Sequence, residues 1–379
     1  MKEKLSFQQS VLIGSLLFGL FFGAGNLIFP VQMGQLAGNN TPLATVGFLV
    51  TGVGLPILGI IASSLSQSEN VLHMATPISK PYAIFFTCAL YLTIGPLFAI
   101  PRTATVAFEV GMRPFVAKEQ LQFGLLIFSL IFFVLTLYFS LRPGRILDWV
   151  GKYLTPIFLL LLSVILIATF LKPMGQVNMY PPQGNYADNS LFTGFLEGYN
   201  TMDALASLAF AIIIISNVQK LGIRRPTLIA IETCKAGLVC VIGMTSIYAS
   251  LAYMGATSLG SVGRGDNGGI ILSMVSNHYL GVIGQVLLAI IVAVACLKTA
   301  IGLITSCAEM FNKMFPKSFT YKMYAMLFTF FSFTIANMGL NKIIQLSIPV
   351  LMFLYPLAIT LIILSLLSPI LHKQRDVYR

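Results

Sequence analysis

Long apolar runs joined by short polar connections follow one another along the whole chain. A helix needs about 20 predominantly apolar residues to cross the hydrocarbon core of a bilayer. Ten segments meet this requirement, at residues 8–36, 42–66, 79–111, 121–141, 150–171, 189–218, 226–254, 280–312, 319–338 and 342–371. The longest connections, 172–189 and 255–279, are expected to be loops. The pattern predicts an all-α polytopic membrane protein whose residues 1–379 form a single transmembrane domain.

Two of these runs are interrupted near their middle by glycines and polar residues. The first carries Gly23, Gly25 and Asn26 between apolar residues, and the sixth carries the polar stretch 197–203. Unwound backbone at membrane depth is stable only where protein or water covers it, and its free N–H and C=O groups offer partners to a small ligand. We therefore predict that helices 1 and 6 are broken and that the two breaks form one transport site. Close helix packing through Gly23 and Gly25 is the alternative.

The two interrupted runs open two blocks of five spans, residues 1–171 and 189–371. Many transporters consist of two such halves in inverted orientation, with the corresponding helices broken at the same place. A shift of 174 residues places Leu17, Phe18, Phe21 and Asn26 on Leu191, Phe192, Phe195 and Asn200. We therefore expect an inverted repeat of helices 1–5 and helices 6–10.

The charged residues indicate how the spans lie in the bilayer. They make up only 9% of the chain, against about 25% in soluble domains, while hydrophobic residues make up 57%. The net charge is +11, and its positive residues are unevenly distributed. If the spans cross the membrane in turn, 15 Lys and Arg residues lie in the tails and loops on the side of the N-terminus, and five lie in the loops on the opposite side. This bias predicts that both termini are cytoplasmic, and it assigns the basic charge to orientation in the lipid bilayer and not to nucleic acid.

Several enzyme classes lack their motifs in this sequence. Residues 263–266 spell the Gly-x-Gly-Asp of intramembrane aspartyl proteases, but Asp266 lies in a connection and not in a span. No His-Glu-x-x-His of a zinc protease and no phosphate-binding loop for ATP occurs. The five cysteines all fall within apolar spans, so disulfides are not expected. We expect neither an enzyme nor a cofactor, and an ion gradient as the energy source.

The two predicted breaks offer complementary partners for a zwitterion. An amino acid inside a membrane needs donors for its carboxylate and acceptors for its ammonium group. The half-helix that starts near Asn26 would present the N-terminal amides of Ala24 and Gly25 to the carboxylate. At the second break, the carbonyls freed within Gly198–Thr201 and the hydroxyl of Tyr199 would receive the ammonium group.

The eighth span offers oxygen ligands for a small cation. The carbonyl of Ala295 and the hydroxyl of Thr299 are four residues apart on one helix face, and hard oxygen ligands suit sodium. A hydrogen bond from Thr299 back to its own helix is the alternative. Among the ionisable residues inside spans, Glu197 and Asp203 flank the second break, where either would serve a coupling cation or pair with Arg102.

Three stretches carry long motifs, namely FFGAGNLIFP at 21–30, GFLVTGVGLP at 47–56 and LTIGPLFAIPRTAT at 92–105. With residues 295–309 and 348–357, these motifs resemble the bacterial branched-chain amino acid:cation symporters. The resemblance implies the leucine-transporter-like fold of five plus five inverted helices. It also implies import of leucine, isoleucine and valine with sodium across the bacterial cytoplasmic membrane. Coupling to protons, and an amino acid sensor or interaction protein without transport, are the alternatives.

The same resemblance implies where the ligands bind. The sodium ligands would be the carbonyls of Gly19, Phe22 and Ala295 with the hydroxyl of Thr299. The amides of Ala24 and Gly25 would hold the carboxylate, and Asn26 would brace the first break. The apolar side chain of the substrate would contact Ile94, Gly95, Phe98 and Tyr199.

The sequence departs from the family pattern in two respects. Lys298 stands where sodium-coupled relatives of the wider fold often carry a hydroxyl. If its ammonium group enters the site, it would displace sodium or titrate during transport. Carriers of this family usually have twelve helices and ten are found here. Because the two others are peripheral in the fold, we expect a complete transport core.

Overall fold

The computed structural model describes residues 4–66, 70–141 and 155–376, and this part of the chain contains helices and no strand. The first half comprises α1 (Phe7–Phe21), α2 (Ala24–Ala37), α3 (Thr41–Leu49), α4 (Leu55–Leu65), α5 (Val71–Ala75), α6 (Lys80–Leu92), α7 (Ala99–Gly111), α8 (Leu121–Ser140) and α10 (Thr155–Leu171). The second half comprises α11 (Asn185–Asp188), α12 (Ser190–Gly198), α13 (Asp203–Lys220), α14 (Pro226–Ser258), α15 (Gly268–Met314), α16 (Tyr321–Ala336) and α17 (Leu340–Asp376).

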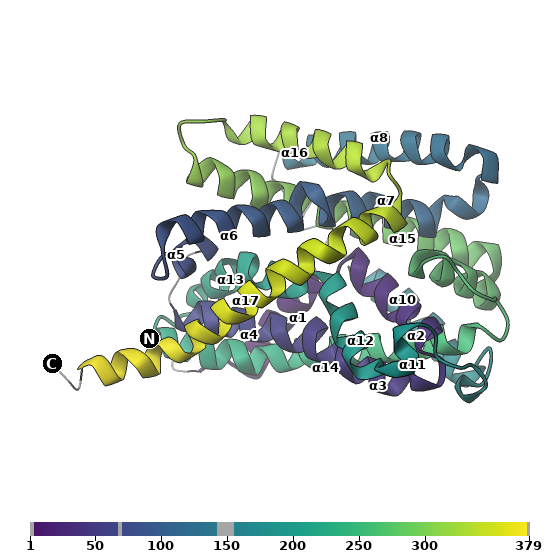
Figure 1. Cartoon of the computed structure of the whole chain (residues 1–379), viewed down its shortest axis with the longest axis horizontal. Helices are drawn as coiled ribbons and strands as arrows, with labels where there is room; N and C mark the ends of the chain where they lie inside the picture. The colour runs from purple at the N-terminus through teal and green to yellow at the C-terminus, as the bar shows by residue number, and fades with distance from the viewer. Residues whose placement is uncertain (1–3, 67–69, 142–154, 377–379) are drawn as a thin grey trace.

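Each of the ten expected spans coincides with one helix or one interrupted helix, and residues 150–154 of the fifth lie outside the described part. Among the described helices, six are long and apolar enough to cross a bilayer, or seven if the bent α13 is counted as one span. Helix α1 is apolar but shorter, because the first span is broken. The start of α1 and the end of α17 lie on the same side of the molecule, as an even number of crossings requires (Figure 1).

The helices form two layers. Helices α1 and α2 pack on α14, α12 packs on α3 and α13 packs on α4, and we call this group the bundle layer. Helix α15 packs on α7 and α16, and α8 packs on α16; with α6, these helices form the scaffold layer. Figure 1 shows the scaffold layer above and the bundle layer below, with α17 running obliquely across both. Both broken helices therefore belong to the bundle layer.

Glycines bring the backbones of the bundle layer into direct contact. A Cβ atom at Gly34 of α2 would lie 1.9 Å from the carbonyl oxygen of Ala252 on α14. A Cβ atom at Gly194 of α12 would lie 2.0 Å from the carbonyl oxygen of Ala44 on α3. Small residues at helix interfaces are the usual means of close packing in membranes. Each half of the chain thus presses its broken helix against the second span of the other half.

The connection predicted over 255–279 is mostly helical, so the prediction of a loop there is wrong. Helix α14 continues to Ser258, and α15 begins at Gly268 and not at residue 280. The side chain of Asn267 caps α15 by accepting a hydrogen bond from the amide of Ile270 at 3.1 Å. Gly281, with φ of 63°, bends the helix where the apolar span starts. The apolar pattern detected only the part of α15 beyond this bend.

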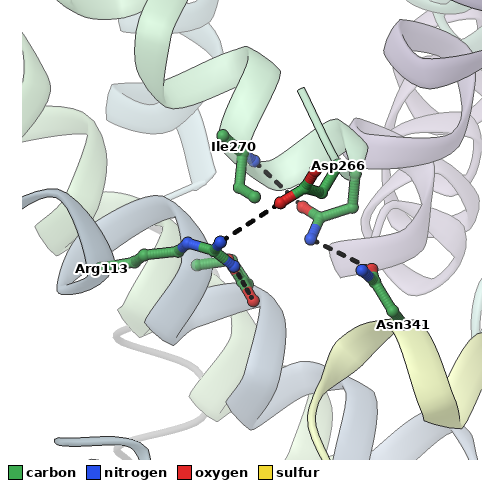
Figure 2. A network of polar contacts seen from close by, with 6 residues as sticks. Arg113, Asp266, Ile270 and Asn341 are labelled. Carbon is green, nitrogen blue, oxygen red and sulfur yellow. Dashed lines mark hydrogen bonds and ion pairs between the residues drawn. The ribbon is translucent and has the colours of Figure 1, made fainter. Parts of the chain in front are cut away.

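A polar network joins the ends of α7, α15 and α17 on the side of the molecule opposite the chain termini (Figures 1 and 2). Arg113 pairs with Glu109 at 2.7 Å and with Asp266 at 3.4 Å. The side-chain amide of Asn267 donates to Asn341 at the start of α17, at 3.2 Å. This network fastens the connection between α14 and α15 to both the scaffold layer and α17.

Candidate functional site

The first helix break lies between α1 and α2, at Phe22 and Gly23. Gly23 is the N-cap of α2, has an extended backbone and offers no side chain to the amides of the first turn. The first amides of a helix have no intrahelical partner, so those of Ala24 and Gly25 are available to a ligand. A Cβ atom at Gly23 would have no neighbour closer than 3.7 Å, which is the methyl group of Thr299. Gly23 is therefore not a packing glycine like Gly34.

The second break lies between α12 and α13 and contains a short 3-10 turn, Tyr199–Thr201. Met202 follows with φ of 62°, a left-handed conformation that costs a non-glycine residue about 1–3 kcal/mol. The hydroxyl of Thr201 donates to the carbonyl of Gly198 at 2.9 Å and accepts from the amide of Asp203 at 3.3 Å. These local bonds stabilise the strained turn and place Asp203 at the first position of α13.

Asn26 and Tyr248 join the two breaks. The side-chain amide of Asn26 lies within hydrogen-bond distance of the Phe21 carbonyl, at 2.9 Å, and of the Asp203 carboxylate, at 2.8 Å. The hydroxyl of Tyr248, on α14, lies 2.5 Å from the same amide and donates to Asp203 at 3.2 Å. All of these side chains are buried. Sequence analysis expected Asn26 to brace its own break but gave no signal for Tyr248, which lies on a regular helix.

A cavity of about 50 Å³ lies between the two layers, beside both breaks. It is lined by Leu20, Phe21, Gly23, Gly25, Asn26, Ile94, Ala99, Arg102, Thr103, Thr201, Met202, Asp203, Ala206, Phe210, Thr299 and Leu303. The volume suffices for water or an ion, whereas small-molecule sites usually have about 300–1,000 Å³. The site is therefore too small for an amino acid in this conformation, and a larger ligand requires the layers to separate.

The structure brings seven of the sequence-predicted site residues to this cavity. These are Gly23, Gly25, Asn26, Ile94, Thr201, Asp203 and Thr299. Ala24 lies between two lining residues and contributes backbone. Ala295 lies one turn before Thr299 on α15 and accepts a hydrogen bond from the Thr299 hydroxyl at 3.1 Å, the bond expected as the alternative. This bond leaves the acceptor lone pairs of the Thr299 oxygen available.

The other predicted residues lie behind or beside the cavity wall. Gly95 faces Cys307, because a Cβ atom there would lie 2.6 Å from the sulfur, and Phe98 is buried next to it. Tyr199 stacks on Tyr355 at 3.8 Å, and its carbonyl accepts a hydrogen bond from the Tyr355 hydroxyl. The residues that do not line the cavity are Gly19, Phe22, Gly95, Phe98, Glu197, Gly198, Tyr199, Asn200, Ala295 and Lys298.

Arg102 lines the cavity without a carboxylate partner. Its Nη1 donates to the carbonyl of Asn200 at 2.6 Å, and its guanidinium lies 5.0 Å from the centre of the Phe29 ring. The ion pairs in the described part of the chain involve other residues, so the possible pairing of Arg102 with Glu197 or Asp203 is not formed. Sequence analysis placed Arg102 inside a span but did not place it in the site.

Comparison with known proteins identifies the family. The family model for "Branched-chain amino acid transport protein" matches residues 6–379. The branched-chain amino acid permease BrnQ of Lactobacillus delbrueckii subsp. lactis is 51% identical over 99% of this chain and 85% of its own length. The branched-chain amino acid permease BraB of Bacillus subtilis is 44% identical over 100% of this chain and 84% of its own length.

Solved structures agree on the fold. MhsT, crystallised with L-phenylalanine, is 14% identical and gives a TM-score of 0.61 over 96% of this chain and 89% of its own. Mhp1, a nucleobase-cation-symport-1 family transporter, gives 0.60 over 93% of this chain and 77% of its own. These similarities confirm the leucine-transporter-like fold expected from the sequence. The protein is a multi-pass transport permease and not an enzyme, and it belongs to the branched-chain amino acid transport protein family.

Proposed function

We propose that this protein imports leucine, isoleucine and valine across the bacterial cytoplasmic membrane by sodium-coupled alternating access. The single observation that carries the proposal is the cavity beside the two helix breaks. It combines free backbone amides, a buried carboxylate and an apolar wall, which are the groups that an apolar amino acid needs. Membership of the family supports the substrate class.

Once the layers separate enough to enlarge the cavity, the surrounding groups favour one orientation of the substrate. Its carboxylate binds the amides of Ala24 and Gly25 at the start of α2, where the helix dipole favours negative charge. Its ammonium group binds at the second break, where Asp203 and the backbone of Thr201 line the cavity. Its branched side chain packs on the apolar lining, with Gly95, Phe98 and Tyr199 behind this wall. The lining residues of this apolar part are Ile94, Ala99, Ala206, Phe210 and Leu303.

The sodium ion is proposed to bind where the first break faces α15. Gly23 faces Thr299 there, because a Cβ atom on the glycine would lie 3.9 Å from the threonine hydroxyl. Carbonyls of Gly19, Phe22 and Ala295 complete the proposed oxygen set. Lys298, the neighbour of Thr299 in the chain, does not line the cavity and makes no ion pair within the described residues.

Proton coupling is the second candidate, and Asp203 favours it. This carboxylate is buried, lines the cavity and has no cationic side chain at ion-pair distance in the described part of the chain. A buried carboxylate beside a substrate site is a suitable proton carrier in a transporter. Glu197 is only half-buried and lies outside the cavity, so it is the weaker carrier.

Uptake into proteoliposomes tests the proposal and separates the two ions. Purified protein is reconstituted, and radiolabelled leucine uptake is measured with a sodium gradient at equal pH and with a proton gradient without sodium. We expect accumulation above equilibrium with the sodium gradient alone. Accumulation with the proton gradient alone would identify the proton as the coupling ion. Leucine binding without accumulation under either gradient would contradict transport and favour a sensor.

The proposed orientation places both termini in the cytoplasm. The distribution of Lys and Arg supports it, since 15 of these residues lie on the side of the chain termini and five on the other. Labelling of single cysteines introduced at Lys317 and Asn341, which lie at opposite ends of the layers, tests the orientation with a membrane-impermeant reagent. We expect labelling of intact cells at position 341 only.

A further inference from the structure

We propose that Arg102 binds the carboxylate of the substrate, together with the amides at the start of α2. The proposal rests on the proposed function, because it assigns one group of the same site. It changes the chemistry of that site, since a fixed positive charge on the scaffold layer would then contact a ligand held by the bundle layer. Arg102 would therefore make the cavity selective for amino acids over amines of the same shape.

The first argument is the unsatisfied charge of Arg102. The side chain is 4% exposed and lines the cavity. A guanidinium carries five N–H donors, and one of them, on Nη1, bonds the Asn200 carbonyl. No carboxylate lies at ion-pair distance within the residues that the structure describes. A buried charge is costly unless an opposite charge compensates it. Asp203 attracts Arg102 across the cavity without forming an ion pair, and the substrate carboxylate would contact the guanidinium directly.

The second argument is the direction of the guanidinium. Its Nη2 lies 3.2 Å from the position that a Cβ atom on Gly25 would occupy. Arg102 therefore reaches the first turn of α2, where the free amides lie, and glycine at position 25 leaves room for it. The Phe29 ring supports the guanidinium at 5.0 Å and limits its movement. The guanidinium of the scaffold layer and the free amides of the bundle layer, which both bind anions, thus lie next to each other.

A purely structural role accounts for only part of this geometry. The bond from Nη1 to Asn200 holds the second break against α7, and a long neutral donor would also make it. A purely structural role does not explain why the Nη2 group lies beside Gly25. Asp203 lines the same cavity, so the cavity presents one group of each sign, as a zwitterionic ligand requires.

The test compares two ligands that differ in the carboxylate alone. Competition by leucine and by leucinamide against bound radiolabelled leucine is measured for purified wild-type protein, Arg102→Gln, Arg102→Lys and Lys80→Gln. Lys80→Gln removes an exposed positive charge from the start of α6, which continues into α7, and serves as the control. We expect wild-type protein to prefer leucine by at least about 30-fold, the lower limit for a buried charge pair that loses one partner.

Arg102→Gln should lose most of this preference, because leucine binding weakens while leucinamide binding changes by less than about threefold, a difference under 1 kcal/mol. Arg102→Lys keeps the charge without the planar fork and should give an intermediate preference. Lys80→Gln should show the same preference for leucine over leucinamide as wild-type protein. If Arg102→Gln does not purify as a monodisperse protein, two other variants carry the test. Arg102→Lys and Phe29→Leu, which removes the aromatic support of the guanidinium, must then both lower the preference for leucine over leucinamide.

An equal loss of affinity for both ligands would show a structural role and overturn the proposal. A wild-type protein that binds leucine without preference over leucinamide would overturn it too. A wild-type protein that binds neither ligand would instead contradict the proposed function.

Discussion

Replacing Tyr248 with phenylalanine tests whether the two helix breaks are held together by the hydrogen bonds of Asn26 and Asp203. The substitution removes one hydroxyl, which lies 2.5 Å from the Asn26 amide and 3.2 Å from the Asp203 carboxylate. The ring that remains fills the same fully buried space, so no cavity is created. The effect therefore reports the hydrogen bonds and not the packing.

The structure sets the expected magnitude. A hydrogen bond to a charged group contributes about 1.5–3 kcal/mol, and a buried partner left unsatisfied costs a similar amount. A loss of about 1.5–3 kcal/mol of unfolding free energy should lower the melting temperature by about 3–12 °C, at roughly 2–4 °C per kcal/mol. Leucine affinity should fall about tenfold, which corresponds to 1.4 kcal/mol, because the breaks that form the site are no longer fixed relative to each other.

Melting of the detergent-solubilised protein and leucine binding are the two measurements. Tyr253→Phe is the matched control, because Tyr253 lies on the same helix, stacks on Phe170 and makes no hydrogen bond through its hydroxyl within the described residues. Tyr248→Phe should also have a smaller effect in an Asp203→Asn background, with a coupling energy of about 0.5–3 kcal/mol. Strict additivity of the two substitutions, or equal effects of the two Tyr→Phe changes, would refute the linkage.

Two further predictions concern the packing and the cation. Gly34→Ala should lower the melting temperature by several degrees, because a Cβ atom 1.9 Å from a backbone oxygen forces α2 and α14 apart and overpacking costs about 1–3 kcal/mol. Gly302→Ala, with open space around its Cβ position, should be neutral or stabilising by up to about 1 kcal/mol; equal melting of both variants would contradict this account. Thr299→Ala should raise the half-saturating sodium concentration of leucine uptake about tenfold, and Cys296→Ala much less. Indistinguishable sodium curves would remove Thr299 from the site.

The broken helices were predictable from the sequence because their cause is local. Glycines and an asparagine inside an apolar run cannot continue a membrane helix without cost, so Gly23 and the stretch around Asn200 identified both breaks. The interruptions at Val50–Gly54 and Thr93–Leu97 have a similar composition but were not predicted. Small residues there are equally typical of helix packing, so composition alone does not separate the two uses.

The side chains that reach the two breaks from other helices were not predictable, because long-range contacts determine them. Tyr248 reaches Asn26 from 222 positions along the chain, and its own helix is regular. Arg102 was recognised as a costly intramembrane charge, but its direction toward Gly25 depends on how α7 packs against α2. Sequence reasoning therefore found seven of the residues that line the cavity, but it missed the position of Arg102 there and the contact of Tyr248 with Asn26.

The glycine contacts of the bundle layer restrict how the protein can move. At Gly34 and Gly194, main-chain atoms of neighbouring helices already touch, so these helices cannot slide or twist past each other without a collision. We therefore expect α2 to move together with α14, and α3 together with α12. A cross-link between α2 and α14, or between α3 and α12, should therefore leave transport intact.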